Sequence, residues 1–152
     1  MRTKDYLKQY CELCGKVERY RERIEQIEAS LLKSINLDGL PHGTGTSDPT
    51  QQIAIKLSEV RSKLNIAMME AELTRQTIAT EIEEVENPIY RELLYSRYIL
   101  GETRLTKWED VTDRISKGRE NRYDTKHVMS YMHDQALKAF EKARNRSALK
   151  VF

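Results

Sequence analysis

Apolar residues near the start of the chain recur at alternating spacings of four and three. This heptad pattern is typical of a helix that buries one apolar seam against another helix. The seam residues are Tyr6, Tyr10, Leu13, Val17, Tyr20, Ile24, Ile27 and Leu31. Charged residues fill the positions between them, as expected where the other faces of a helix contact water. We therefore predict a long amphipathic helix that ends near Asn36.

A second long helix is predicted after a loop at residues 36–50, which hold three of the six glycines and two of the three prolines. Asp48 can cap this helix and Pro49 suits its first position. Its apolar face consists of Ile53, Leu57, Val60, Leu64, Ala67, Ala71, Ile78, Ile82 and Val85. Two such helices predict an antiparallel coiled-coil hairpin over residues 1–86. The tyrosine-rich first seam could serve this hairpin or a dimer interface.

Three shorter helices are predicted in the rest of the chain, from residue 87 to 152. Asn87 and Pro88 repeat the cap-plus-proline signal, and Gly101 should end this helix. Thr106 and Glu109 have the spacing of a capping box, which predicts a second helix from there.

The last of these helices should start near Asp124 or Thr125 and run to about Ala143, with a frayed tail after Arg144. The three helices should share a core whose members are Ile89, Leu93, Leu94, Tyr98, Ile99, Trp108, Val111, Ile115, Val128, Met132, Ala136, Leu137 and Phe140.

The composition supports an all-α fold, because 33% of residues are charged and only six are glycine. No apolar run reaches membrane-spanning length and no signal peptide is evident, so we expect a cytoplasmic protein with no membrane partner. Net charge is uneven: residues 117–152 carry nine basic and four acidic side chains, although the whole chain is only +2. This asymmetry indicates an anionic partner for the C-terminal end.

Three stretches could carry chemistry, and each favours a structural interpretation. Cys11 and Cys14 have metal-ligand spacing, but no second pair completes a zinc site. The glycines at residues 43–45 lack the Lys-Ser/Thr ending of a phosphate loop, and the acidic residues 81–86 are typical of a solvated helix face. No set of nucleophile, base and orienting group appears. We therefore expect a protein that is not an enzyme and that has no cofactor or metal.

The last two helices fit a helix-turn-helix, in which the second helix enters the major groove of DNA and its first residues contact base edges. Polar, basic and small apolar groups on the front of the last helix suit such contacts. The candidate base-contacting residues are Thr125, Lys126, His127, Met129, Ser130 and His133. The candidate phosphate-contacting residues are Thr106, Lys107, Arg119 and Arg122. An ordinary solvated face of a helical bundle is the alternative interpretation.

Three segments strengthen the DNA-binding interpretation: residues 86–101 (ENPIYRELLYSRYILG), residues 108–111 (WEDV) and residues 128–138 (VMSYMHDQALK). Together they resemble small phage proteins related to sigma factor region 4, which include late-gene transcriptional regulators of the ArpU and RinA type. The resemblance covers roughly residues 84–140. It departs from the family pattern at residues 102–107 and 117–123, where this chain is longer.

This resemblance implies a phage or prophage origin, a bacterial host cytoplasm and a DNA-binding helix-turn-helix. By position, Thr125, Lys126, His127, Met129 and Ser130 match the family's exposed recognition face, while Trp108 and His133 match motif positions.

The function expected from the sequence is sequence-specific binding of double-stranded DNA in transcription regulation, with a homodimer compatible with it. The alternative is a non-enzymatic adaptor that binds RNA polymerase or another protein through the helical hairpin.

Overall fold

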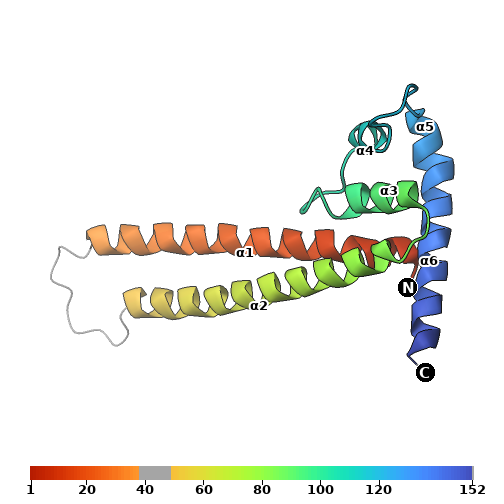
Figure 1. Cartoon of the computed structure of the whole chain (residues 1–152). Helices are drawn as coiled ribbons and strands as arrows, with labels where there is room; N and C mark the ends of the chain where they lie inside the picture. Colours follow the sequence, from red (N-terminus) through yellow and green to blue (C-terminus); the bar gives the residue numbers. More distant parts are fainter. Residues whose placement is uncertain (38–48, 152) are drawn as a thin grey trace. The chain divides into compact units, whose positions relative to one another are not determined.

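The computed structural model describes residues 1–37 and 49–151, and every regular element in them is a helix, as predicted (Figure 1). The chain divides into two compact units, residues Lys16–Glu70 and residues Met1–Gly15 with Ala71–Phe152. We call the first the tip unit and the second the base unit. Within the described residues, no helix is long and apolar enough to cross a membrane.

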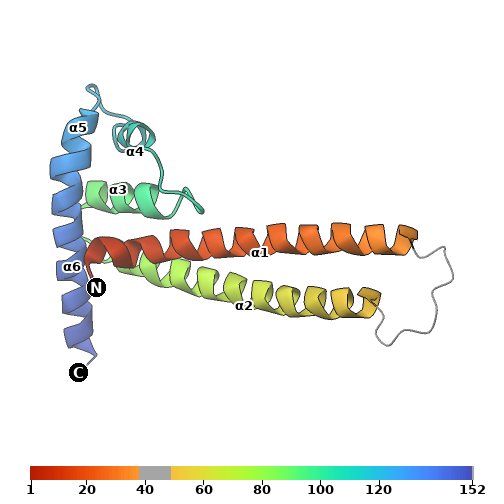
Figure 2. The same ribbon diagram turned by 180° about the vertical axis from the view of Figure 1, so that it is seen from behind.

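The tip unit consists of parts of two long helices, α1 (Thr3–Leu37) and α2 (Pro49–Glu83). They lie side by side and antiparallel (Figure 2). Val17, Ile27 and Leu57 are buried between them, so the tip part of the predicted first seam packs within the chain. α2 starts at Pro49 as predicted. The predicted cap Asp48 and most of the 36–50 loop lie outside the described residues.

In the base unit, the first turns of α1 and the end of α2 pack against the C-terminal helices and share one apolar core with them. Leu7, Ile78 and Val85 are at most 1% exposed, as are Leu93 and Phe140. The sequence placed a domain boundary at residues 86 and 87, but this core includes side chains from both sides of that position. An amphipathic helix end buries its apolar face against whatever apolar surface lies beside it, and here that surface belongs to the C-terminal helices.

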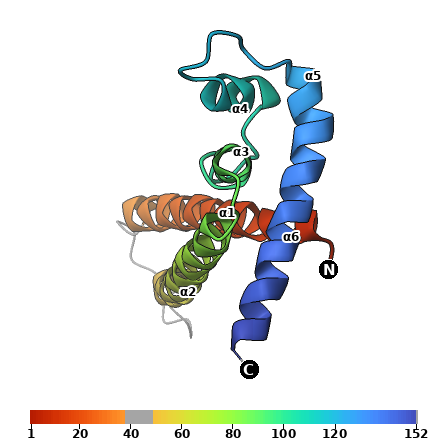
Figure 3. The ribbon, with the colours of Figure 1, turned by 45° about the vertical axis from the view of Figure 1, so that its right-hand side comes forward.

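Tyr6, Glu81 and Arg144 join three helices of the base unit. The Tyr6 hydroxyl donates a hydrogen bond to Glu81 Oε2 at 2.6 Å, and Arg144 Nε lies 3.3 Å from Glu81 Oε1. The Arg144 guanidinium also lies 3.9 Å from the centroid of the Tyr6 ring. Burial, then the Glu81 carboxylate, raises the pKa of Tyr6 to about 12, so its proton stays in this bond. Figure 3 shows the start of α1 beside the long C-terminal helix.

Helix α3 (Pro88–Tyr98) begins with the predicted cap, because the Asn87 side chain accepts hydrogen bonds from Ile89 N at 2.9 Å and Tyr90 N at 3.4 Å. Its C-terminal end leads to a turn in which Glu102 has a φ of 52°.

Helix α4 (Trp108–Ile115) starts one residue later than its capping box predicted. Lys107 is the N-cap residue and its side chain makes no cap hydrogen bond, so the prediction of a box between Thr106 and Glu109 is wrong. The reason is that Thr106 is bonded to α3: its N–H donates to the Arg97 carbonyl at 3.1 Å, and its carbonyl accepts from the Arg97 guanidinium.

The last helix is continuous from residue 125 to 150 and contains a π-helical turn. It consists of α5 (Thr125–His127), the π turn η1 (Val128–Met132) and α6 (His133–Lys150). The N–H of His133 reaches the carbonyl of Val128, five residues back. The helix extends to Lys150 rather than fraying after Arg144. Ion pairs of Arg144 with Glu81 and of Arg146 with Glu86, the latter at 2.5 Å, attach this end to α2 and its C-terminal turn.

Candidate nucleic-acid interface

The start of the last helix presents one exposed face and one buried face. Val128 and Met132 are 0% and 6% exposed and pack inward. Lys126, His127 and Ser130 are exposed. Asp124 starts the helix, because its carboxylate accepts a hydrogen bond from His127 N at 3.0 Å. The inner anchors therefore fix which residues point outward.

Five of the six candidate base-contacting residues lie on or beside this face. Besides the three above, Met129 is 46% exposed and Thr125 is half-buried. The Ser130 hydroxyl donates to the carbonyl of Lys126 at 2.7 Å. This bond uses the hydroxyl proton, so the oxygen of this exposed residue can act only as an acceptor, which suits the amino group of adenine or cytosine.

Tyr131 is a candidate that the sequence reasoning missed. Its side chain is 57% exposed, and its ring stacks on His127 with centroids 5.2 Å apart and an interplanar angle of 22°. Two rings four residues apart on a helix are neighbours, so this spacing was the available signal. The pair adds a flat aromatic surface to the exposed side of the helix.

His133 is a correction to the predicted set, because it is buried at 7% exposure rather than placed on the outer face. Its Nε2 lies 2.8 Å from the Tyr98 hydroxyl, and its ring meets Trp108 edge-on at 4.9 Å. The physical reason is the π turn: one extra residue in the turn rotates the following residues relative to an ideal α-helix and brings His133 inward beside Met132.

The surroundings of His133 keep its imidazole neutral. Burial, followed by the charges of Lys4 and Arg97, lowers its pKa to about 4. Arg97 itself lies over the Trp108 ring, with 4.2 Å from guanidinium carbon to ring centroid. Trp108 is thus held between Arg97 and His133, which agrees with the packing role expected for it.

Thr106 does not fit its predicted role as a phosphate contact. Its Oγ1 is buried and is the side-chain atom without a hydrogen-bond partner among the described buried groups. Burial against α3 removes the hydroxyl from solvent, where a phosphate would lie. Lys107, one residue later, is exposed at the start of α4 and keeps a position suited to phosphate.

Arg119 and Arg122 lie in the segment that connects α4 to the last helix, and both are exposed. Arg122 Nε lies 2.5 Å from Asp113 Oδ1, and its Nη1 lies 3.3 Å from the Thr125 hydroxyl. The Arg119 guanidinium lies over the Tyr123 ring at 4.2 Å. Arg122 therefore connects α4 to the start of the last helix, and a phosphate would compete with Asp113 for it.

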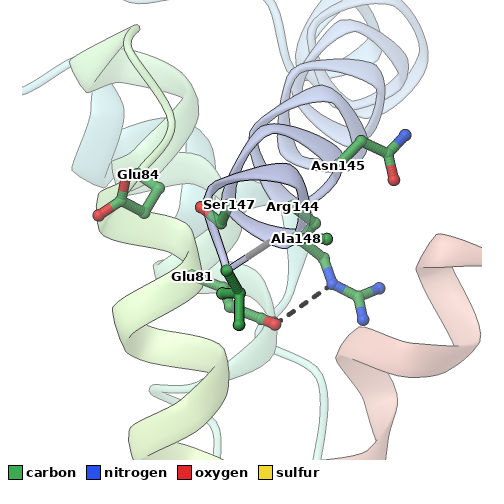
Figure 4. A pocket seen from close by; sticks show the side chains of 7 residues that line it. Glu81, Glu84, Arg144, Asn145, Ser147 and Ala148 are labelled. Atoms are coloured by element: carbon green, nitrogen blue, oxygen red, sulfur yellow. Dashed lines mark hydrogen bonds and ion pairs between the residues drawn. The ribbon is translucent and has the colours of Figure 1, made fainter.

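An open cavity of about 400 Å³ lies elsewhere in the base unit, between the ends of α2 and α6 (Figure 4). Its lining includes Glu81, Glu84, Arg144 and Ser147, and the Arg144–Glu81 ion pair crosses it. None of the predicted site residues contributes to it.

In the described part of the chain, no group of three or more His, Cys, Asp or Glu side chains lies close enough together to hold a metal ion. Cys11 and Cys14 are half-buried on α1. Burial, and then Cys14, raises the pKa of the Cys11 thiol, which disfavours the thiolate needed for metal binding.

Comparison with known proteins gives no match for this chain among family models, curated proteins or solved structures. The resemblance to phage regulators related to sigma factor region 4 therefore stays a prediction from the sequence motifs.

Proposed function

We propose that the chain is a DNA-binding regulator of transcription, and that α4 with the last helix acts as its helix-turn-helix. The observation that carries the proposal is the exposed face of Lys126, His127 and Ser130, which Val128 and Met132 anchor from the inside. A recognition helix needs this combination of an apolar back and a polar, basic front. The excess of basic residues in 117–152 adds the electrostatic attraction on which DNA affinity depends.

Within this proposal, the exposed side chains divide into two roles. Lys126 and His127 are donors for guanine or phosphate, and Met129 can contact the methyl group of thymine. Lys107 and Arg119 would orient the protein on the phosphate backbone, without reading sequence.

The test is a fluorescence-anisotropy titration of the full chain against a random duplex pool and against duplexes selected from that pool by the protein. The proposal expects selected duplexes to bind tightly at physiological salt and random duplex to bind weakly. The Lys126→Ala, His127→Ala double variant should bind selected duplexes roughly 10- to 100-fold more weakly, as expected for loss of a base contact worth ~1–3 kcal/mol. Far-UV circular dichroism should be unchanged.

A matched control is Lys33→Ala, which removes an exposed lysine on α1 in the tip unit, away from every surface proposed to bind, and should leave affinity unchanged. Equal binding to all duplexes that disappears as salt rises would mean phosphate attraction alone and would overturn sequence-specific reading. That outcome would favour the adaptor function, which cross-linking of the full chain to RNA polymerase would then test.

A further inference from the structure

Helix α2 carries apolar side chains on two opposite sides. One side is the seam, where Leu57, Ala67 and Ala71 are at most 8% exposed. On the other side, within the tip unit, Ile66 is 57% and Met69 is 67% exposed. At ~100° per residue, their spacing of three keeps these two side chains within about 60° of one another. A helix with apolar residues on both sides is typical of one that is covered on both sides.

We propose that the stripe formed by Ile66 and Met69 binds the same stripe on a second copy of the chain, with the two α2 helices antiparallel. This dimer does not depend on the proposed DNA-binding function. The stripe alone does not identify its occupant, but the charges beside it do.

Lys63 and Glu70 flank the stripe and are both exposed. In an antiparallel pair, Ile66 faces Met69 of the second copy, and Lys63 then lies beside Glu70 of the second copy. The two-fold axis repeats each contact, so two apolar contacts and two opposite-charge pairs form at once. The surface is therefore complementary to itself.

A parallel pair lacks this complementarity. In that arrangement the flanking positions bring Asn65 beside Glu70 and Ser58 beside Lys63, so no opposite charges meet. Within the chain, Glu70 Oε2 lies 3.9 Å from Lys16 Nζ, at the outer limit of an ion pair and exposed to water. Such a pair contributes little and can exchange for a closer one.

The size of the stripe sets the expected affinity. Two apolar side chains from each copy bury much less than the ~1,200 Å² of a standard protein interface. We therefore expect a weak and reversible dimer, populated at roughly tens to hundreds of micromolar chain.

Sedimentation equilibrium of the full chain over low to several hundred micromolar concentrations tests the proposal. A monomer–dimer equilibrium is expected. Lys63→Glu alone and Glu70→Lys alone should each weaken it on the order of tenfold, because two ion pairs become two repulsions. The Lys63→Glu, Glu70→Lys double variant should recover dimerisation, which a purely structural role of either residue would not produce.

Met69→Lys should abolish dimerisation, whereas Met68→Lys, next to it but off the stripe and 43% exposed, should not. Circular dichroism of each variant checks that the helices remain. A chain that stays monomeric at the highest concentration would overturn the proposal. So would a dimer that Lys63→Glu and Met69→Lys leave unchanged, since the contact would then lie on another surface.

Discussion

The Tyr98 hydroxyl and the Nε2 of His133 lie 2.8 Å apart inside the base unit, although 35 positions separate the two residues in the chain. Tyr98 is the last residue of α3, and His133 follows the π turn of the last helix. The bond satisfies two polar groups that are almost completely removed from water. It therefore holds the start of the last helix, and with it the exposed face of Lys126 and His127, against α3.

Stability should depend on pH through His133. Its pKa is about 4 in the folded chain against a usual 6.5, so between these values the unfolded chain holds more protons than the folded one. Stability contributed by the neutral imidazole is therefore present above pH 6.5 and is lost as pH falls toward 4. The free energy of unfolding in urea should fall between pH 7 and pH 4.5 in the native chain. This fall should be about 2 kcal/mol larger than in the His133→Gln variant, whose side chain cannot titrate. Equal differences in both proteins would contradict this assignment.

Asn87 and Thr106 were both predicted to cap helices, but substitutions at the two positions should change the free energy of unfolding in opposite directions. Asn87→Ala removes bonds to two backbone N–H groups and should cost about 1 kcal/mol of unfolding free energy. Thr106→Val replaces a buried hydroxyl that has no partner with a methyl group of similar size, and should be neutral or stabilising by up to about 1 kcal/mol. Denaturant unfolding measures both. Destabilisation by Thr106→Val comparable to that of Asn87→Ala would indicate that Thr106 caps α4 after all.

In the turn after α3, a substitution at residue 102 should raise the free energy of unfolding, and one at residue 101 should lower it. Glu102 has a left-handed φ of 52°, which costs a non-glycine residue roughly 1–2 kcal/mol, so Glu102→Gly should stabilise by about 0.5–1 kcal/mol after the flexibility of glycine is included. Gly101→Ala should destabilise by more than about 1 kcal/mol, because its Cβ would lie 2.0 Å from the Arg104 carbonyl oxygen.

The matched control for this turn is Thr103→Gly, which adds flexibility without relieving a positive φ and should destabilise slightly. Thermal unfolding of the three variants measures these effects. An increase in melting temperature for Thr103→Gly as large as that for Glu102→Gly would rule out relief of backbone strain as the cause.

Tyr131 should contribute to DNA binding if the proposed function is correct. Tyr131→Ala removes the ring that stacks on His127 and should weaken binding to selected duplexes about tenfold, whereas Tyr131→Phe keeps the ring and should retain most of the affinity. Equal losses in both variants would assign the contact to the hydroxyl instead. Because Tyr131 is exposed, neither substitution should change the unfolding free energy by more than about 0.5 kcal/mol.

Local sequence signals determined the helices of this protein. The heptad spacing from Tyr6 to Leu31 predicted α1, and Asn87 with Pro88 predicted the start of α3, because periodicity and caps act within a few residues. The buried face of Val128, Met132 and Phe140 also followed from spacing alone. Lys126, His127 and Ser130 lie outside that buried face, so their exposure could be predicted from the same spacing.

Only the tertiary structure decided which of the predicted DNA-contacting residues are buried. Nothing in the local sequence shows that Arg97 bonds the backbone of Thr106 and moves the start of α4 to Trp108. Nor does it show that a π turn carries His133 inward to Tyr98. The cause is the same in both cases: the partner that satisfies each of these polar groups lies nine or thirty-five positions away in the chain, beyond the range of any local pattern.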